Sequence, residues 1–232
     1  TQGRVALVLG RKPENIAVRP PMPRPESAAA PGVAPPAAAP GGGARRAGEG
    51  IPGSGFNRPS DVAWDAAGNI YVADGLGANN RVAKFDKDGR FIRHWGATGS
   101  APGEFRGLKA IVLDAKGQVY VADTGNRRVQ VFDGNGQFQR EFAGVGTPLS
   151  MCITKGATQH LYIAHAGDPD GMEDAAIYKV ALDGTVIGKF GSAGKQVKQF
   201  GLANSLDCRG ENELLVGEAA NWRVQRVTVK AR

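Results

Sequence analysis

Short runs of apolar residues, each closed by polar turn residues, recur along most of the chain. One run is Asn69-Ile70-Tyr71-Val72-Ala73-Asp74, and a second is Gln118-Val119-Tyr120-Val121-Ala122-Asp123. Runs rich in Val, Ile and Tyr, bounded by Gly, Asn and Asp, are typical of β-strands joined by tight turns. No stretch of the sequence has the sustained helical period, with caps, that would predict a helix. The pattern therefore predicts an all-β protein.

The runs return at an interval that identifies a repeat. Tyr71 and Tyr120 lie 49 positions apart, and Tyr120 and Tyr162 lie 42 positions apart. Each interval has room for three or four strands, which is one blade of a β-propeller. A blade cannot bury both of its faces alone, so blades stack around an axis. The recognisable copies span 55–91, 103–138, 161–184 and 199–225, and the third is degenerate.

Two polar positions recur inside the copies. An acidic residue ends the second strand, and an Arg follows it in an Asn-x-Arg segment. The acidic residues are Asp74, Asp123 and Glu218, and the arginines are Arg81, Arg128 and Arg223. A set that is repeated in three blades is better explained by structure than by catalysis, which needs one site. We interpret these residues as structural polar pairs or turn-locking hydrogen bonds.

These motifs resemble the NHL repeat family. The resemblance covers about residues 55–230 and is strongest in the first, second and fourth copies. It implies a β-propeller, often one with six blades. It implies no single activity, because one fold supports many functions.

The N-terminal segment Gly3–Gly10 resembles the last strand of a copy. It matches Gly89–Gly96 and Gly184–Gly191, whereas the fourth copy ends near Lys230 without such a strand. We predict that residues 1–18 hold an outer strand, which either closes a four-bladed ring or ends an earlier blade. We favour the second interpretation, in which the four copies are part of a six-bladed ring.

Residues 19–50 differ in kind from the repeats. Eight of the 14 prolines of the chain lie between positions 20 and 40, and Ala and Gly fill much of the rest. Such a composition cannot build a core and favours an extended or disordered chain. Because the segment follows a predicted strand, we interpret it as a low-complexity loop between blades, and we assign the propeller blades to 51–232.

The positive charge of the chain is concentrated before the repeats. The net charge is +7. Residues 1–50 hold seven basic and three acidic residues (+4), which leaves 22 basic and 19 acidic residues (+3) for the remainder. Nucleic-acid binding usually needs a basic stripe on one folded face. The near balance over the blades therefore makes nucleic acid an unlikely partner.

Composition also bears on membranes and on cysteine chemistry. No run of 18 apolar residues occurs, so the sequence predicts no transmembrane helix. Cys152 and Cys208 fall in the predicted inner strands of adjacent blades. A disulfide requires their Cα atoms to approach within about 7 Å. We expect two buried free thiols, the usual state of Cys in a core.

Ligand sites in propellers form at the axis, where the inner strands begin. Residues at or just before the start of the predicted inner strands are polar, and two of the group are arginines. The set is Arg58, Ser60, Arg106, Lys109, Ser150 and Asn204. This ring predicts a site for a small anionic or polyhydroxy ligand, or for ordered water.

The copies also resemble the propeller of the peptidyl-α-hydroxyglycine α-amidating lyases. The resemblance rests on Phe56–Val62 and Asn221–Gln225. It implies a metal held by several histidines, some of them at the start of inner strands. Here Leu108-Lys109 and Ala203-Asn204 stand at those positions, and Leu76 replaces an expected tyrosine. The sequence departs from the family pattern where the metal would bind.

The chain has three histidines: His94, His160 and His165. Catalytic zinc needs about three protein ligands and an open position, and no three-histidine site can be assembled from residues in an outer strand, at a turn and at a strand end. We interpret His165 as a structural substitute for the repeated Asp. Asp168 and Asp170 form an acidic loop that could bind calcium with His165, but their spacing does not match an EF-hand, and a solvated loop is the simpler interpretation. We expect no catalytic residue and no cofactor.

The sequence therefore predicts a non-catalytic scaffold that binds a protein partner, and possibly a small polar ligand or a glycan. We expect it to be a subunit of an extracytoplasmic assembly, periplasmic or at the cell surface. The first alternative is a metal-dependent enzyme of the amidating-lyase type, with its ligands on blades outside this sequence. The second is an RNA-binding NHL propeller.

Overall fold

A computed structural model of the chain describes residues 55–166, 174–210 and 212–229. The described residues form strands and turns and almost no helix, which confirms the predicted all-β propeller. The predicted N-terminal strand, the low-complexity loop at 19–50, and Asp168 and Asp170 lie outside the described residues. Within the described part of the chain, no helix is long and apolar enough to cross a membrane.

The strands form successive antiparallel blades that pair in chain order. The first blade contains β1 (Pro59–Trp64), β2 (Ile70–Asp74), β3 (Arg81–Phe85) and β4 (Phe91–Trp95). The second contains β5 (Leu108–Leu113), β6 (Val119–Asp123), β7 (Arg128–Phe132) and β8 (Phe138–Phe142), with the short 3-10 helix η1 (Thr124–Asn126) before β7. The third contains β9 (Pro148–Ile153), β10 (His160–His165), β11 (Ala176–Ala181) and β12 (Val186–Phe190).

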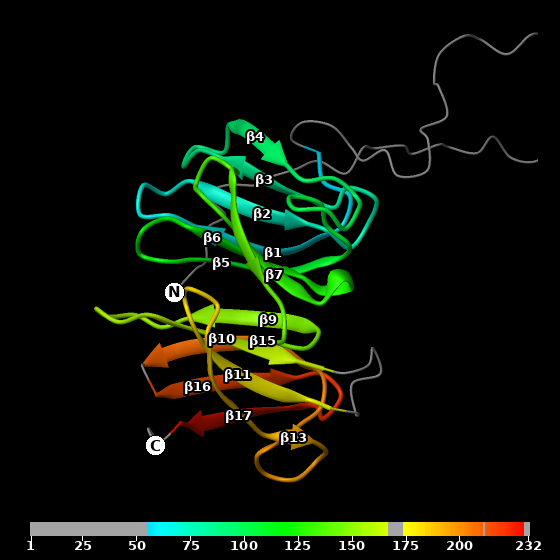
Figure 1. Cartoon of the computed structure of the whole chain (residues 1–232), viewed down its shortest axis with the longest axis vertical. Helices are drawn as coiled ribbons and strands as arrows, with labels where there is room; N and C mark the ends of the chain where they lie inside the picture. Colours follow the sequence, from blue (N-terminus) through cyan, green and yellow to red (C-terminus); the bar gives the residue numbers. More distant parts are fainter. Residues whose placement is uncertain (1–54, 167–173, 211, 230–232) are drawn as a thin grey trace, which may run out of the picture.

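The fourth blade has three described strands: β15 (Ala203–Gly210), β16 (Glu213–Glu218) and β17 (Arg223–Thr228). The loop that precedes it contains a short parallel pair, β13 (Ser192–Ala193) and β14 (Gln199–Phe200). Figure 1 shows the first two blades in one half of the molecule and the third and fourth, which overlap in this view, in the other half. The inner strands β1, β5, β9 and β15 contact one another in that order.

The hydrophobic core lies between successive blades. We call the side of a blade that meets the next blade its front face, and the opposite side its back face. The front face of the first blade packs Tyr71, Ala73 and Val82 on the back face of the second, which contributes Ile111, Val119 and Val121. The same arrangement joins the second blade to the third and the third to the fourth. Stacking thus buries the two apolar faces that alternation along each strand creates.

A buried tyrosine adds a polar link between blades. The hydroxyl of Tyr71 donates a hydrogen bond to the carbonyl of Gly134 in the second blade, at 3.2 Å. The hydroxyl of Tyr120 reaches Leu182 in the third blade in the same way, at 3.3 Å. The recurrence of tyrosine at this position therefore has a structural cause, since each ring fills the core and each hydroxyl finds a partner across it.

The back face of the first blade is uncovered at its inner strand. Val62 and Trp64 are 50% and 70% exposed, whereas Ile111, at the register position of Val62 in the second blade, is 1% exposed. The described blades therefore begin with an apolar surface of the kind that a preceding blade covers elsewhere in the molecule.

Candidate functional site: the leading rim of the channel

The four inner strands surround a central channel. A cavity of about 390 Å³ is lined by β1, β5, β9 and β15. A second hollow, of about 530 Å³, lies among the turns that follow β1, β5 and β9 and includes Trp64, Asp114 and Gln159. We call the end at which the inner strands begin the leading rim, and the end with these turns the opposite rim. All of the residues predicted to face a ligand lie at or near the leading rim.

The residue that ends the second strand of each blade holds the backbone at the leading rim. The carboxylate of Asp123 accepts a hydrogen bond from the N–H of Arg106, at 2.8 Å. Asp74 accepts one from the N–H of Arg58, at 3.0 Å. Glu218 accepts one from the N–H of Gly201, at 2.8 Å. The repeated acid therefore anchors the segment that leads into its own inner strand.

The repeated arginines lie beside these acids. Nε of Arg128 is 2.8 Å from Oδ2 of Asp123, and Nε of Arg223 is 2.9 Å from Oε1 of Glu218. The Arg81–Asp74 pair is longer, at 3.5 Å. Arg128 also donates from Nη2 to two backbone carbonyls of the preceding loop, at 2.9 Å each. These six residues are thus joined in three separate latches, one in each of three blades.

His165 occupies the acid position of the third blade. Its Nδ1 accepts a hydrogen bond from the N–H of Thr147 at 2.6 Å, and its Nε2 lies 3.2 Å from Oδ2 of Asp174. The ring is 1% exposed and packs on Gly146, where any Cβ would lie about 2.1 Å from Nδ1. Both ring nitrogens are therefore engaged by protein groups, which is unfavourable for a metal ligand.

The hydrogen bonds to Glu218 predict that the stability of the fold depends on pH. Burial by itself would raise the pKa of Glu218, but hydrogen bonds from Arg223, Gly201, Gln225 and Asn221 outweigh it and hold the pKa below its ordinary value. Because the pKa is lower in the folded state, the stabilisation is complete above the unfolded pKa of about 4.3 and is lost as the pH falls through the folded pKa.

We expect Glu218→Gln to make the free energy of unfolding less dependent on pH in the acid range. The wild-type free energy of unfolding should fall more steeply than that of the variant between about pH 5 and pH 3, because only the wild type has a carboxylate to protonate. Urea unfolding at several pH values measures both slopes. Equal slopes would show that Glu218 gains nothing from its partners.

Two of the predicted ligand-facing hydroxyls are used between blades. Oγ of Ser60 donates to the carbonyl of Leu108 at 2.9 Å, and Oγ of Ser150 donates to the carbonyl of Ala203 at 2.9 Å. The pairing register also places Leu149, not Ser150, level with Ser60. Pro148 pairs with His165 as Pro59 pairs with Asp74, and Leu149 and Ser60 each come next in the chain. The predicted ring is therefore less uniform than the sequence indicated, and its serines hold inner strands together.

The cations of the leading rim have a different environment. Arg58, Arg106 and Lys109 are exposed and form no ion pair with any described residue. The carbonyls of Arg58 and Arg106 accept equivalent hydrogen bonds from Leu76 and Gly125, so the two side chains start from the same place in adjacent blades. The rim over the first two blades is therefore cationic.

The corresponding carbonyls in the third and fourth blades belong to Thr147 and Leu202, which are uncharged. Asn204 is exposed and stands level with Ser60 and Lys109. The structure thus places the predicted cations together on one side of the rim, and neutral residues on the other.

Asp61 is a residue of the channel that the sequence did not single out. Its Oδ2 accepts a hydrogen bond from the N–H of Ile111, and its Oδ1 accepts one from the N–H of Val62, both at 2.9 Å. Burial raises the pKa of Asp61 more than these two hydrogen bonds lower it. Asp61 connects the inner strands of the first two blades, as Ser150 does for the third and fourth.

Comparison with known proteins agrees with this architecture. Residues 56–165 match a family model described as a 6-bladed beta-propeller (DUF5128). Human NHL repeat-containing protein 3 is 39% identical over 79 residues, which are 34% of this chain and 23% of that protein. These repeats are NHL-type propeller blades.

Further relatives include proteins named as amidating enzymes. Peptidyl-glycine alpha-amidating monooxygenase B of Xenopus laevis is 39% identical over 93 residues, which are 37% of this chain and 10% of that protein. A probable peptidyl-alpha-hydroxyglycine alpha-amidating lyase of Caenorhabditis elegans is 29% identical over 127 residues, 51% of this chain and 36% of that protein. The NHL blades of this chain thus span a minor part of the curated relatives they match.

Solved structures share the fold at low identity. Hydrazine synthase of Kuenenia stuttgartiensis has a TM-score of 0.52 at 13% identity, over 81% of this chain and 53% of that one. A Bacteroides fragilis protein that is named a putative exported protein has a TM-score of 0.54 at 16% identity, over 76% of this chain and 50% of that one. This chain covers about half of each, and the likeness concerns the fold alone.

Cys152 and Cys208 correct a sequence-based expectation. We expected two free thiols, but the two residues form a disulfide between adjacent NHL blades, with their Cα atoms 5.7 Å apart. Cys152 lies on the front face of the third blade and Cys208 on the back face of the fourth, within one core cluster. Pairing follows from which faces meet, which the sequence alone does not reveal.

The histidines do not assemble at the channel of the NHL blades. His94 lies in the outer strand β4, His160 begins β10, and His165 is engaged as described. In the described part of the chain, no three His, Cys, Asp or Glu residues are grouped so that they could hold a metal ion. The proposed calcium ligands Asp168 and Asp170 lie outside that part.

Proposed function

We propose that this chain is a non-catalytic binding propeller that presents its leading rim to a protein partner. The supporting observation is a difference between the polar side chains of the channel, which are hydrogen-bonded between strands, and the arginines of the rim, which are not ion-paired with a described residue. Asp61, Ser60 and Ser150 are used to join inner strands, whereas Arg58 and Arg106 extend from the same rim without an ion pair among the described residues. A cationic rim of this kind favours a partner with an acidic contact surface.

We further propose that the protein works outside the cytoplasm as a subunit of an assembly. The Cys152–Cys208 disulfide supports this proposal, because structural disulfides persist mainly in oxidising compartments. The likeness to a protein named as exported is compatible with it. Exposed Val62 and Trp64 offer a second, apolar surface that a larger ring or assembly would cover.

Charge reversal at the rim tests the proposal. The triple variant Arg58→Glu, Arg106→Glu and Lys109→Glu should lose its partner when the tagged protein is captured from its own envelope fraction. The matched control is Lys116→Glu, which changes an exposed charge at the opposite rim. Capture should also weaken as salt is raised. A triple variant that retains the same partner as the wild type would refute the role of the rim.

The amidating-lyase relatives favour a second candidate, a metal-dependent lyase whose ligands lie on further blades. Elemental analysis of the purified full protein separates the two functions. Zinc or calcium bound at one ion per molecule, together with cleavage of a peptidyl-α-hydroxyglycine substrate, would support the lyase. Absence of both would remove it.

A further inference from the structure

Trp222 is a large aromatic residue with no structural role that its surroundings reveal. It precedes β17 and is 92% exposed. Its φ of 53° lies in the left-handed region, which glycine and asparagine adopt more readily than an aromatic residue. A side chain that is exposed and sits on an unfavourable backbone conformation does not stabilise the fold. Its exposed indole is therefore available to contact a ligand.

The second blade shows that further blades would leave Trp222 exposed. Arg127 occupies the equivalent position before β7, also with a positive φ, of 56°. Arg127 remains exposed although the third blade packs beside it, whereas its neighbour Val129 is fully buried by that blade. By the same geometry, a following blade would cover Val224 and leave Trp222 in solvent. The position is not exposed in every blade, since the equivalent Asn80 has a φ of 41° and is 7% exposed, but Arg127 shows that a large side chain there can remain in solvent beside a following blade.

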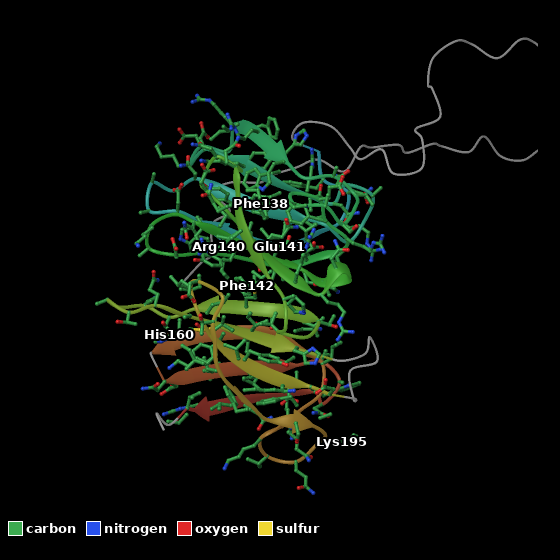
Figure 2. The ribbon with its side chains drawn as sticks, viewed as in Figure 1. Phe138, Arg140, Glu141, Phe142, His160 and Lys195 are labelled. Atoms are coloured by element: carbon green, nitrogen blue, oxygen red, sulfur yellow. A yellow bond between two sulfur atoms is a disulfide. The ribbon has the colours of Figure 1, made fainter. Side chains whose placement is uncertain are left out.

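Trp222 borders a small hollow that has polar walls. The hollow, of about 180 Å³, is lined by Lys195, Ala220, Asn221, Trp222 and Arg223. Figure 2 shows Lys195 at the end of the molecule beside β13. Its side chain is exposed and forms no ion pair with a described residue, so its ammonium group is available.

Hydrogen bonds fix the walls of this hollow. Nδ2 of Asn221 donates to the carbonyl of Gly194 at 2.8 Å and to Glu218 at 2.6 Å. The guanidinium of Arg223 donates to the carbonyl of Lys195 and to that of Gln196. Oδ1 of Asn221, in contrast, is buried and accepts no hydrogen bond from a described residue. The bonds of Nδ2 and of the guanidinium hold Asn221 and Arg223 in place beside Trp222.

We propose that this hollow binds an acidic sugar residue of a polysaccharide. The apolar C–H face of a pyranose ring packs on the exposed Trp222 indole, because aromatic side chains offer a large apolar contact area in binding sites. The carboxylate of a uronic acid pairs with the ammonium group of Lys195. The hollow is small enough that it recognises one residue of the polymer, and the ammonium group of Lys195 favours an anionic polymer.

This inference deepens the proposed binding function by naming a ligand, but it uses a different surface. The leading rim of the first two blades contributes none of the residues of the hollow. The two proposals can therefore fail separately. If the rim variant loses protein capture but still binds the sugar, only the proposal for the hollow is supported. If it keeps protein capture and the protein binds no sugar, only the proposal for the rim is supported.

Titration with polygalacturonate tests the proposal. We expect the polymer to change the intrinsic fluorescence of the wild-type protein, since Trp222 is one of three tryptophans and, at 92% against 70% for Trp64, is the most exposed. Neutral cello-oligosaccharide should bind at least about tenfold more weakly, because Lys195 then has no anion to meet. Poly(U), as a single-stranded nucleic acid of the same charge sign, serves as the competing polyanion.

Two substitutions make the test specific. Trp222→Gly should weaken polygalacturonate binding by about tenfold or more, and should leave the melting temperature unchanged or raise it, because glycine suits a positive φ. Lys195→Gln should weaken binding and reduce its dependence on salt, because the neutral side chain no longer attracts the carboxylate. The matched control is Arg127→Gly, which makes the same backbone change at the equivalent position of the second blade and should leave binding unchanged.

Four results would overturn the proposal. The first is no binding of polygalacturonate at millimolar sugar concentration. The second is unchanged affinity in Trp222→Gly. The third is tighter binding of poly(U) than of polygalacturonate, which would assign the aromatic platform to nucleic acid. A loss of melting temperature in Trp222→Gly would also count against it, since it would give the indole a structural role.

Discussion

Replacing Asp123 by alanine is expected to lower the free energy of unfolding by about 4 kcal/mol. Asp123 is fully buried and accepts hydrogen bonds from the N–H of Arg106, from Nε of Arg128, from Asn126 and from Gln130, at 2.8 to 3.1 Å. Its removal leaves the buried Arg128 guanidinium without its main counter-charge. Breaking a buried pair from one side costs about 3–5 kcal/mol, because the remaining charge stays desolvated.

Glu141→Ala provides the matched control, because Glu141 pairs with the same arginine from the surface. Its Oε2 lies 2.8 Å from Nη1 of Arg128, but its side chain is 39% exposed. A surface pair of this kind contributes about 0–1 kcal/mol. Urea unfolding of both variants gives the comparison. If the two substitutions had similar effects, the latch around Asp123 would not be the main constraint on the second blade.

The disulfide is expected to have an effect of similar size. Changing Cys152 and Cys208 together to serine should lower the free energy of unfolding by about 4 kcal/mol, since the bond closes a loop with a sequence separation of 56 residues. The bond also holds the inner strands of the third and fourth blades together at the channel wall. Its loss should therefore favour separation of the fourth blade, which has only three described strands.

Reduction of the wild-type protein is the complementary measurement, because it breaks the bond without changing the sequence. Thermal unfolding with and without a reductant should show a lower melting temperature in the reduced state. The double variant should be insensitive to the reductant. Two thiols that react in the unfolded but unreduced wild-type protein would show that the bond is absent.

For the repeated acids, the sequence predicted the pairing with arginine but not the contact with the backbone. The recurrence of Asp74, Asp123 and Glu218 with an arginine indicated a structural pair, because a catalytic set would not recur in three blades. The geometry adds that each acid also holds the backbone before its inner strand. That contact joins residues 16 to 17 positions apart in the chain, and nothing in the local pattern specifies it.

The channel was harder to predict than the fold. Ser150 was grouped with Ser60 by its distance from the inner-strand start, but Pro148 pairs with His165 as Pro59 pairs with Asp74, so Ser150 is one residue further along and is level with Asp61. A one-residue shift turns every side chain of a strand to the other face. The exposure of Trp222 was not predicted, for another reason. Its exposure depends on a backbone conformation at the blade edge, although its alignment with Arg127 was visible in the Asn-x-Arg motif.

By itself, the sequence determined the strand pattern, the blade period and the residues that recur in each blade. Those features depend on the alternation of apolar and polar side chains along each strand and on the need of each blade to bury two apolar faces. Both can be recognised from the order of residues in the chain. Only the tertiary structure decided which faces meet. That contact paired Cys152 with Cys208, committed Ser60 and Ser150 to neighbouring strands, and left the rim cations and Trp222 exposed. The physical reason is that these outcomes depend on distances between blades, which repeat spacing does not specify.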